Sequence, residues 1–185
     1  ECSPCVSVNR DSWHKDGSCG VALRCNQVRV GESGEVLVRG ANIMAGYLGK
    51  PELTAARVDN DGWLHTGDVG HIDQDGFLYV DGRLDDVIVL ADGTMVAPEV
   101  LERALGANLT IAQTLVYGMP DKRSGQVVLA CKLVLRDGAD DAAERAAIDF
   151  ARSVQTPDGA RIEYIELSCE PLPLSPAGKL LRRQA

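Results

Sequence analysis

The sequence predicts an α+β fold in two parts: a β-rich segment over residues 1–82 and a small α+β domain over residues 87–185. In the first part, short apolar runs are separated by Asp-Gly and other glycine-containing turns, a pattern typical of successive strands. From residue 87 onward the expected order is hairpin, helix, two strands, helix and strand, which gives a central sheet flanked by helices. The short polar segment 81–86 is the expected boundary between the two parts.

Strands and turns are expected to alternate in the first part. Asp-Gly pairs favour tight turns between strands, and two such pairs here are each followed by an apolar run that suits a strand. A proline at the first turn favours a short helix. The expected elements are, in order, an irregular lead-in over 1–20, a hairpin over 28–38 around Gly31-Glu32-Ser33-Gly34, a helix over 51–58, and strands at 63–65 and 77–80 opened by Asp61-Gly62 and Asp75-Gly76.

The second part has stronger signals. Asp92-Gly93 between two apolar runs predicts a hairpin. Apolar residues recur at helical spacing from 142 to 154, and the acidic flanks of this helix favour packing on a sheet rather than on lipid. The expected elements are a hairpin over 87–96, a helix over 98–105, strands over 111–117 and 127–135, a helix over 142–154 and a last strand over 162–167.

The charge balance narrows the class of partner. The formal net charge is −8 at pH 7, which argues against a general nucleic-acid or membrane surface. The sequence has no run of about 18 apolar residues that would span a bilayer. Its first residues lack the basic and apolar regions of a signal peptide. A cytoplasmic protein with no nucleic-acid and no membrane partner is therefore expected.

Four of the six cysteines, Cys2, Cys5, Cys19 and Cys25, lie within the first 25 residues. Their spacing could be interpreted as a zinc site, but the second pair lacks the close C-x-x-C spacing of a zinc knuckle. We therefore favour free thiols in a reducing compartment and expect no metal site. Cys131 lies in an apolar run and is predicted to be buried in the core.

Two polar residues have the chemistry of a nucleotide site. Asp68 follows a short strand and comes directly after Gly67, and one ionised carboxylate can accept hydrogen bonds from both hydroxyls of a ribose. The alternative, which spacing alone favours, is a turn aspartate that caps local N–H groups. Arg83 offers planar donors suited to ribose and phosphate oxygens, and its alternative is a surface ion pair with Asp85 or Asp86.

A proline-rich segment over residues 171–179 could present Lys179 at the tip of a stiff loop, because Gly178 permits a tight turn just before it. A positioned ammonium can stabilise charge on a phosphate oxygen. An exposed tail lysine is the commoner alternative. Arg182 and Arg183 continue a basic tail, which is most often solvated but could meet a phosphate. His65 is expected to be structural rather than a catalytic base.

Taken in order, these segments resemble the adenylate-forming superfamily of acyl- and aryl-CoA ligases, firefly luciferase and peptide-synthetase adenylation domains. The resemblance covers nearly the whole chain after residue 17, and several signatures in the right order make it specific. The segments that carry it are 17–20, 34–40 (GEVLVRG), 44–48, 61–68 (DGWLHTGD), 82–86 (GRLDD), 93–102 (GTMVAPEVLE), 117–121 and 175–179 (SPAGK).

The resemblance implies a role for each candidate residue. Asp68 would hold the ribose hydroxyls of ATP or AMP, and Arg83 would contact the same nucleotide. Asp85 would lie in a hinge over residues 83–86, about which the small domain swings between two states. Lys179 would reach the carboxylate and the α-phosphate in the first state. The hairpin around Gly93 would line the channel of the thiol acceptor in the second.

The same resemblance implies an AMP-forming acid–thiol ligase, in which a carboxylic acid is activated as an acyl-adenylate and passed to a thiol. Its cofactors would be ATP, Mg²⁺ with ATP, and CoA or the phosphopantetheine of a carrier protein. Residues 1–82 would be the β-rich end of a truncated large domain, because the family's phosphate loop and most of its acyl pocket would precede residue 1. Thr94 replaces a frequent aromatic residue in the acceptor hairpin.

Three possibilities for the chain follow. The first is an enzyme part, inactive alone, whose partner is the upstream large adenylation domain on the same or a separate chain. The second is a non-catalytic, truncated relative that docks a carrier protein or a partner ligase. The third is a fragment of a longer protein.

Overall fold

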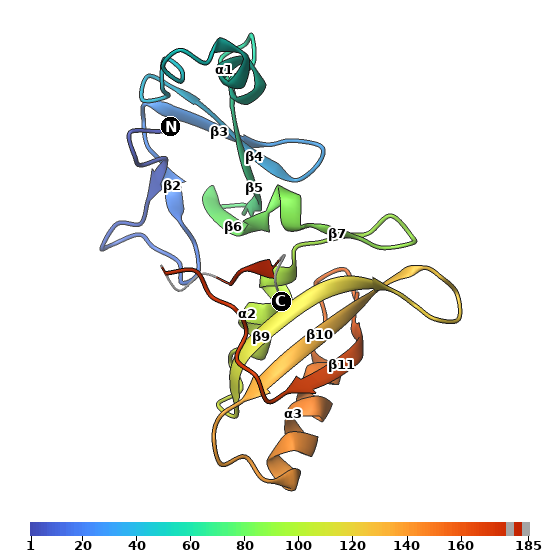
Figure 1. Cartoon of the computed structure of the whole chain (residues 1–185). Helices are drawn as coiled ribbons and strands as arrows, with labels where there is room; N and C mark the ends of the chain where they lie inside the picture. The colour runs from blue at the N-terminus through green and yellow to red at the C-terminus, as the bar shows by residue number, and fades with distance from the viewer. Residues whose placement is uncertain (177–179, 183–185) are drawn as a thin grey trace. The chain divides into compact units, whose positions relative to one another are not determined.

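The structure is a computed structural model that describes residues 1–176 and 180–182 (Figure 1). The chain divides into two compact units, Glu1–Asp85 and Asp86–Ala185. The predicted α+β class is confirmed: over these residues, the elements of the first unit are mostly strands with one short α-helix, and the second unit combines strands with two α-helices. Among the described residues, no helix has both the length and the apolar character needed to cross a membrane.

The first unit is built on a six-stranded antiparallel sheet with the spatial order β1-β2-β6-β5-β4-β3. A single short helix, α1, lies between β4 and β5 in the chain. The elements are β1 (Ser7–Val8), β2 (Gly20–Ala22), β3 (Asn26–Val30), β4 (Glu35–Gly40), α1 (Pro51–Arg57), β5 (Leu64–Ile72) and β6 (Phe77–Arg83).

Two Asp-Gly turns hold the strands of this sheet, as predicted. Asp59 Oδ1 accepts the backbone N–H groups of residues 61 and 63, and Asp73 Oδ1 accepts those of residues 75 and 77. Gly62 and Gly76 have φ angles of +79° and +84°, a region that favours glycine. Each aspartate therefore organises its turn through local hydrogen bonds.

Two expectations for this unit are wrong. Residues 1–20 are not irregular throughout, because β1 pairs with β2 through Ser7 opposite Ala22. The strand at residues 63–65 does not end before Asp68, because β5 runs on to Ile72. Its register against β4 shifts between the His65 and Val69 pairs, so the extra residues form a bulge that bends the strand without ending it.

The second unit contains a two-stranded hairpin, two helices and a three-stranded sheet of order β11-β10-β9, in which β10 pairs antiparallel with β9 and parallel with β11. A 3₁₀ turn at Leu84–Asp86 leads into it. The elements are β7 (Ile88–Val89), β8 (Met95–Val96), α2 (Pro98–Leu105), β9 (Ile111–Pro120), β10 (Val127–Leu135), α3 (Asp141–Ser153) and β11 (Ile162–Ser168).

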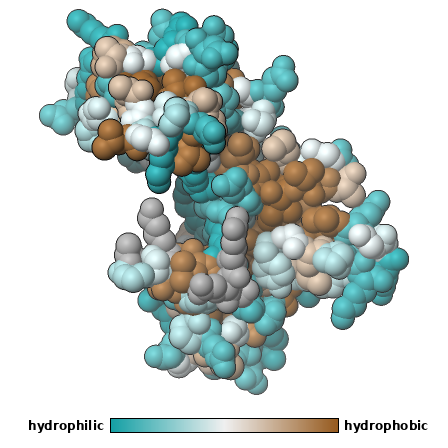
Figure 2. All heavy atoms as spheres, turned by 45° about the horizontal axis from the view of Figure 1, so that its top comes forward, coloured by the Kyte–Doolittle hydropathy of each residue, from teal (hydrophilic) through white to brown (hydrophobic). Residues whose placement is uncertain are grey.

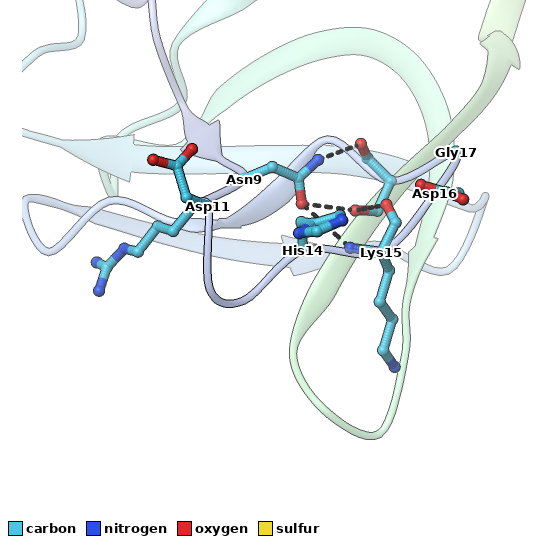
Figure 3. Close-up of a pocket in the computed structure, with 8 residues that line it drawn as sticks. Asn9, Asp11, His14, Lys15, Asp16 and Gly17 are labelled. Carbon is cyan, nitrogen blue, oxygen red and sulfur yellow. Dashed lines mark hydrogen bonds between the residues drawn. The ribbon is translucent and has the colours of Figure 1, made fainter.

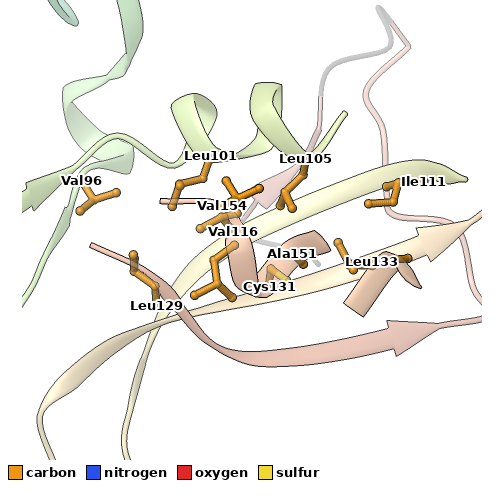
Figure 4. Close-up of a cluster of buried hydrophobic side chains, with 12 residues drawn as sticks. Val96, Leu101, Leu105, Ile111, Val116, Leu129, Cys131, Leu133, Ala151 and Val154 are labelled. Atoms are coloured by element: carbon orange, nitrogen blue, oxygen red, sulfur yellow. The ribbon is translucent and has the colours of Figure 1, made fainter. Parts of the chain in front are cut away.

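Both helices of the second unit pack on the same face of its sheet. The alternating residues Leu129, Cys131 and Leu133 share one buried cluster with Leu101 of α2 and Ala151 of α3, and Figure 4 shows these side chains meeting. Side chains two apart on a strand share a face. The prediction of a buried Cys131 is confirmed, and its burial raises the pKa of the thiol to about 12.

The opposite face of this sheet is covered by the segment after β11 rather than by a helix. Ala130 and Leu115 point to that face and are buried. Leu172, which follows β11, is also buried, and its backbone N–H donates to the Gln113 side chain at 2.7 Å. The segment after β11 is thereby fixed against β9.

The turn after β9 is organised by one exposed carboxylate, that of Asp121. Its Oδ1 accepts from the Tyr164 hydroxyl at 2.5 Å, and its Oδ2 accepts from the backbone N–H groups of Arg123 and Ser124 and from the Ser124 hydroxyl. The hydrogen bond from Tyr164, followed by those from Ser124, holds the pKa of Asp121 well below its ordinary value.

We expect Asp121→Asn to destabilise the protein at pH 7 and to have little effect in acid. The depressed pKa means that the ionised carboxylate favours folding above the unfolded-state pKa of about 3.9, and that this contribution is lost as the pH falls through the lower folded-state pKa. Urea unfolding at pH 7 and at successively lower pH values, to below pH 2, measures the difference, with Asp158→Asn in an exposed turn as the control. A constant difference between wild type and Asp121→Asn over the whole pH range would contradict the assignment.

Candidate functional site

Asp68 and Arg83, predicted separately, lie directly opposite each other on β5 and β6. Arg83 Nη1 is 2.6 Å from Asp68 Oδ1 and also donates to the Thr66 carbonyl at 3.2 Å. The alternative prediction, an ion pair of Arg83 with Asp85 or Asp86, is therefore wrong. The register of the two strands places Asp68 opposite Arg83 instead.

The Asp68 carboxylate does not cap its own turn, since it bonds Arg83, while the Asp68 backbone N–H donates to the Thr66 hydroxyl. The Asp68 and Arg83 side chains are 36% and 45% exposed, so a ligand can reach both. An ionised carboxylate has about four lone-pair positions, and Arg83 uses one of them. The pair can therefore accept two hydroxyl groups and donate to further oxygens.

A buried carboxylate, Glu35 at the start of β4, supports this pair from within the sheet. Its Oε1 accepts the Gly67 backbone N–H at 2.8 Å, and its Oε2 lies 2.9 Å from His65 Nδ1. The residue is only 8% exposed, and a buried charge is tolerated only when it is well bonded. Glu35 therefore fixes the bulge that precedes Asp68, and His65 is structural, as expected.

Sequence reasoning did not assign a role to Glu35. The signal available was a single acidic residue next to the apolar run Val36–Val38 of a predicted strand. An acidic side chain in such a position is rarely buried without a partner. Its partners lie about 30 residues along the chain, where only the sheet register brings them together.

The remaining predicted site residues lie elsewhere. Asp85 is exposed in the 3₁₀ turn that ends the first unit. Gly93 lies at the tip of the β7–β8 hairpin with a φ angle of +88°. Figure 2 shows apolar patches at the surface, and the exposed apolar residues include Val89 and Met95 of this hairpin. Lys179 falls outside the described residues, and its role stays a prediction.

Arg182 is not the solvated tail residue that was expected. Its side chain is 17% exposed and forms a bidentate pair with Glu102 of α2, at 2.8 Å and 2.7 Å. It also lies 3.0 Å from Glu99 and 3.4 Å from Asp86. Acidic residues on α2, 80 residues away in sequence, therefore bury this arginine.

The pKa values around Arg182 reflect a charge cluster with more carboxylates than cations. Burial raises the pKa of Glu99, against the opposing effect of Arg182. For Arg182 itself, burial acts to lower the pKa, but the hydrogen bond and charge of Glu102 outweigh it and the pKa is raised. Glu102 also accepts the Val116 backbone N–H at 2.7 Å, so the cluster links α2, β9 and the C-terminal segment.

The C-terminal segment is closed by backbone pairing. Leu174 and Leu180 form an isolated antiparallel bridge, and the Leu181 N–H donates to the Pro173 carbonyl at 2.9 Å. Arg182 follows directly. The chain on both sides of positions 175–179 is therefore anchored to the same place in the second unit.

A pocket in the first unit is lined by residues 9–11 and 14–18 of a single loop (Figure 3). Asn9 ties the loop together, with its amide donating to the Ser18 carbonyl at 2.8 Å. The Lys15 ammonium forms ion pairs with Asp73 and Asp75, at 2.5 Å and 2.6 Å. These polar groups already bond other residues of the protein, so this pocket is the weaker candidate for a ligand site.

The described residues contain no group of three or more His, Cys, Asp or Glu side chains that could hold a metal ion. Within this part of the chain, Cys2, Cys5, Cys19 and Cys25 are free thiols. The candidate site is therefore the carboxylate–guanidinium pair on β5 and β6.

No protein-family model matches the chain, but comparison with known proteins finds CoA ligases that are similar to it. The chain is 36% identical over 191 residues to 4-coumarate–CoA ligase 2 of Nicotiana tabacum, covering 97% of this chain and 34% of that protein. It is 38% identical over 151 residues to 4-coumarate–CoA ligase-like 9 of Oryza sativa subsp. japonica, covering 82% and 26%. It therefore spans about a third of the length of these relatives or less.

Solved structures agree with these relatives. o-Succinylbenzoate CoA synthetase from Bacillus subtilis, in complex with its acyl-adenylate, is 30% identical with a TM-score of 0.74, over 92% of this chain and 35% of that one. An amide bond synthetase from Marinactinospora thermotolerans is 30% identical with a TM-score of 0.72, over 91% and 35%. An anthranilate CoA ligase bound to anthranoyl-AMP is 25% identical with a TM-score of 0.78, over 95% and 36%.

We expect Arg182→Ala to lower the free energy of unfolding by about 3–5 kcal/mol, because it leaves the carboxylates around it buried without their cation. Urea unfolding followed by circular dichroism measures the change. Arg152→Ala is the matched control, since Arg152 is 67% exposed and lies 3.9 Å from Asp149. The control should change stability by less than about 0.5 kcal/mol. An equal, small effect of both substitutions would show that the cluster contributes nothing to stability.

Proposed function

We propose that this chain, which belongs to the adenylate-forming superfamily of CoA ligases, supplies part of an AMP-forming enzyme that activates a carboxylic acid as an acyl-adenylate and passes it to a thiol. The observation that carries the proposal is the Asp68–Arg83 pair, held at 2.6 Å on adjacent strands and exposed to ligand. Two CoA-ligase relatives and neighbours bound to acyl-adenylates support it.

Asp68 would bind the ribose of ATP or AMP. A ribose presents two neighbouring hydroxyl donors, and a fixed, ionised carboxylate accepts both through charge-assisted hydrogen bonds. Arg83 orients that carboxylate and has further N–H groups for oxygens of the same nucleotide. Glu35 keeps Asp68 in place through Gly67, so the site is organised before the nucleotide arrives.

Lys179 would supply the catalytic charge, because an ammonium beside the reacting carboxylate and α-phosphate stabilises the charge that develops there. In this proposal, residues 1–82 are the end of a large adenylation domain, residues 83–86 with Asp85 form the hinge, and residues 87–185 form the mobile domain. Gly93 at the tip of β7–β8 would then lie in the acceptor channel.

The nucleotide would be ATP before the first reaction and AMP after the second. One structural neighbour was solved with ATP and a magnesium ion. The described residues provide no cluster of ligands for Mg²⁺, so we assign it no residue. The acceptor would be CoA or a carrier-protein phosphopantetheine. We expect the chain alone to be inactive and to require an upstream large domain for activity. We expect the enzyme to act in the cytoplasm.

Mutants of the full-length enzyme test this assignment through ATP–pyrophosphate exchange, which reports adenylation alone. Asp68→Asn should lower kcat/KM for ATP by about 10- to 100-fold, the loss expected for charge-assisted hydrogen bonds. Lys179→Ala should remove exchange almost entirely. Lys122→Ala, in the exposed loop after β9, is the matched lysine control. Wild-type exchange in Lys179→Ala would show that the role given to this lysine is wrong.

Calorimetry distinguishes the enzyme part from a docking module. The 185-residue chain is titrated with AMP and, separately, with a carrier protein. Binding of AMP that Asp68→Asn removes supports the nucleotide site. Binding of the carrier protein without any AMP binding would favour a non-catalytic docking module.

A further inference from the structure

Two guanidinium groups converge above Gly67 in the first unit. A Cβ atom at Gly67 would lie 2.8 Å from Arg83 Nη2 and 3.2 Å from Arg57 Nη1. The two arginines therefore reach the same small volume beside the β5 bulge, from the end of α1 and from β6. The guanidinium groups can come this close because Gly67, with a φ angle of +69°, has no side chain.

The backbone of β5 holds both arginines in this arrangement. Arg57 Nη1 donates to the His65 carbonyl at 3.3 Å, and Arg83 Nη1 donates to the Thr66 carbonyl at 3.2 Å. Val58, which follows Arg57, forms a bridge with Leu64 and so fixes the end of α1 against the start of β5. The convergence is thus built from neighbouring positions of one strand.

Only one of the two arginines is paired with a carboxylate among the described residues. Arg83 is paired with Asp68, but Arg57 has no carboxylate within 4.0 Å among the described residues. Glu35 is already bonded to the Gly67 N–H and His65, and Asp59 lies 3.9 Å from His65. Like charges near each other repel, so an added anion at this place is favoured. Arg57 therefore has donor groups that no carboxylate of the described residues uses.

We propose that Arg57 and Arg83 form an anion subsite over Gly67 that binds a phosphate group of the nucleotide whose ribose is held by Asp68. The inference rests on the proposed function, because Arg83 belongs to both subsites and a phosphate is joined to its ribose. Planar guanidinium groups donate paired N–H groups to phosphate oxygens. Arg57 acts as a binding residue, and its contact adds affinity for charged nucleotides.

Arg57 also has a simpler role, as a basic residue in the last turn of α1 beside the negative end of the helix dipole. That interaction requires no neighbour at Gly67. It leaves the approach of Arg57 Nη1 and Arg83 Nη2 to one place beside Gly67 without a cause. An anion bound by both groups accounts for it.

Side-chain NMR of the 185-residue chain tests the inference directly. Inorganic phosphate, AMP and adenosine are titrated while the Nε–Hε signals of the arginines are followed. Phosphate and AMP should shift the signals of Arg57 and Arg83, and the effect should weaken with added salt. Adenosine should perturb the residues around Asp68 and leave Arg57 unchanged.

Variants separate the two subsites. Arg57→Ala should weaken AMP binding by about tenfold, the factor for one charge-assisted hydrogen bond, and leave adenosine binding unchanged. Arg57→Lys keeps the positive charge but loses the planar pair of N–H donors, so its affinity for AMP should lie between those of wild type and Arg57→Ala. Arg24→Ala removes an exposed charge from the same unit and should change nothing. Backbone spectra of each variant verify that the sheet is intact.

Failure of the anion subsite and failure of the ribose site give different experimental results. Equal AMP binding by wild type and Arg57→Ala, or no response of Arg57 to phosphate, overturns the anion subsite. Adenosine binding that survives Asp68→Asn overturns the ribose site instead. A response of Arg57 to phosphate but not to AMP also overturns the inference, because the anion would then not belong to the nucleotide.

Discussion

The hydrogen bond from the Gly67 N–H to the buried Glu35 carboxylate is the constraint on which the candidate site depends. It holds the bulge of β5 in a backbone conformation that favours glycine, and the bulge sets the positions of Asp68 and of the two arginines around Gly67. Burying a carboxylate is costly unless it is fully bonded, and His65 provides the second partner. A polar interaction inside the sheet thereby determines the geometry of the exposed pair on β5 and β6.

The second unit also uses ionic groups to fix its geometry. Around Arg182, the carboxylates of Glu99, Glu102 and Asp86 outnumber the single guanidinium, whereas beside Gly67 two guanidinium groups converge and only Arg83 is paired with a carboxylate. Buried ion pairs contribute little net stability compared with apolar packing, but they are specific about geometry. The Arg182 cluster fixes the position of Arg182 against α2 and β9.

Most elements were predictable because their signals are local. Helix α2 begins at Pro98 and β10 spans Val127–Leu135 as expected, since a first-turn proline and a continuous apolar run are read within a few residues. The end of β5 was not predictable, because the bulge at Gly67 is stabilised from β4 across the sheet. The burial of Arg182 has the same cause, since its partners lie on α2. Motif order predicted Asp68 and Arg83 as site residues, but only strand register shows that they lie opposite and bond each other.

The overall charge of the chain therefore says little about its ligand. A net charge of −8 disfavours an extended polyanionic partner, because such a partner meets the whole surface. A single phosphate meets only the groups within a few ångströms, where interactions are short-ranged at physiological salt. Around Gly67 the Glu35 carboxylate is turned inward and bonded to the backbone, and Asp68 is paired with Arg83. An acidic protein can bind a small anion when its carboxylates are committed elsewhere, and the proposed subsite at Gly67 depends on that condition.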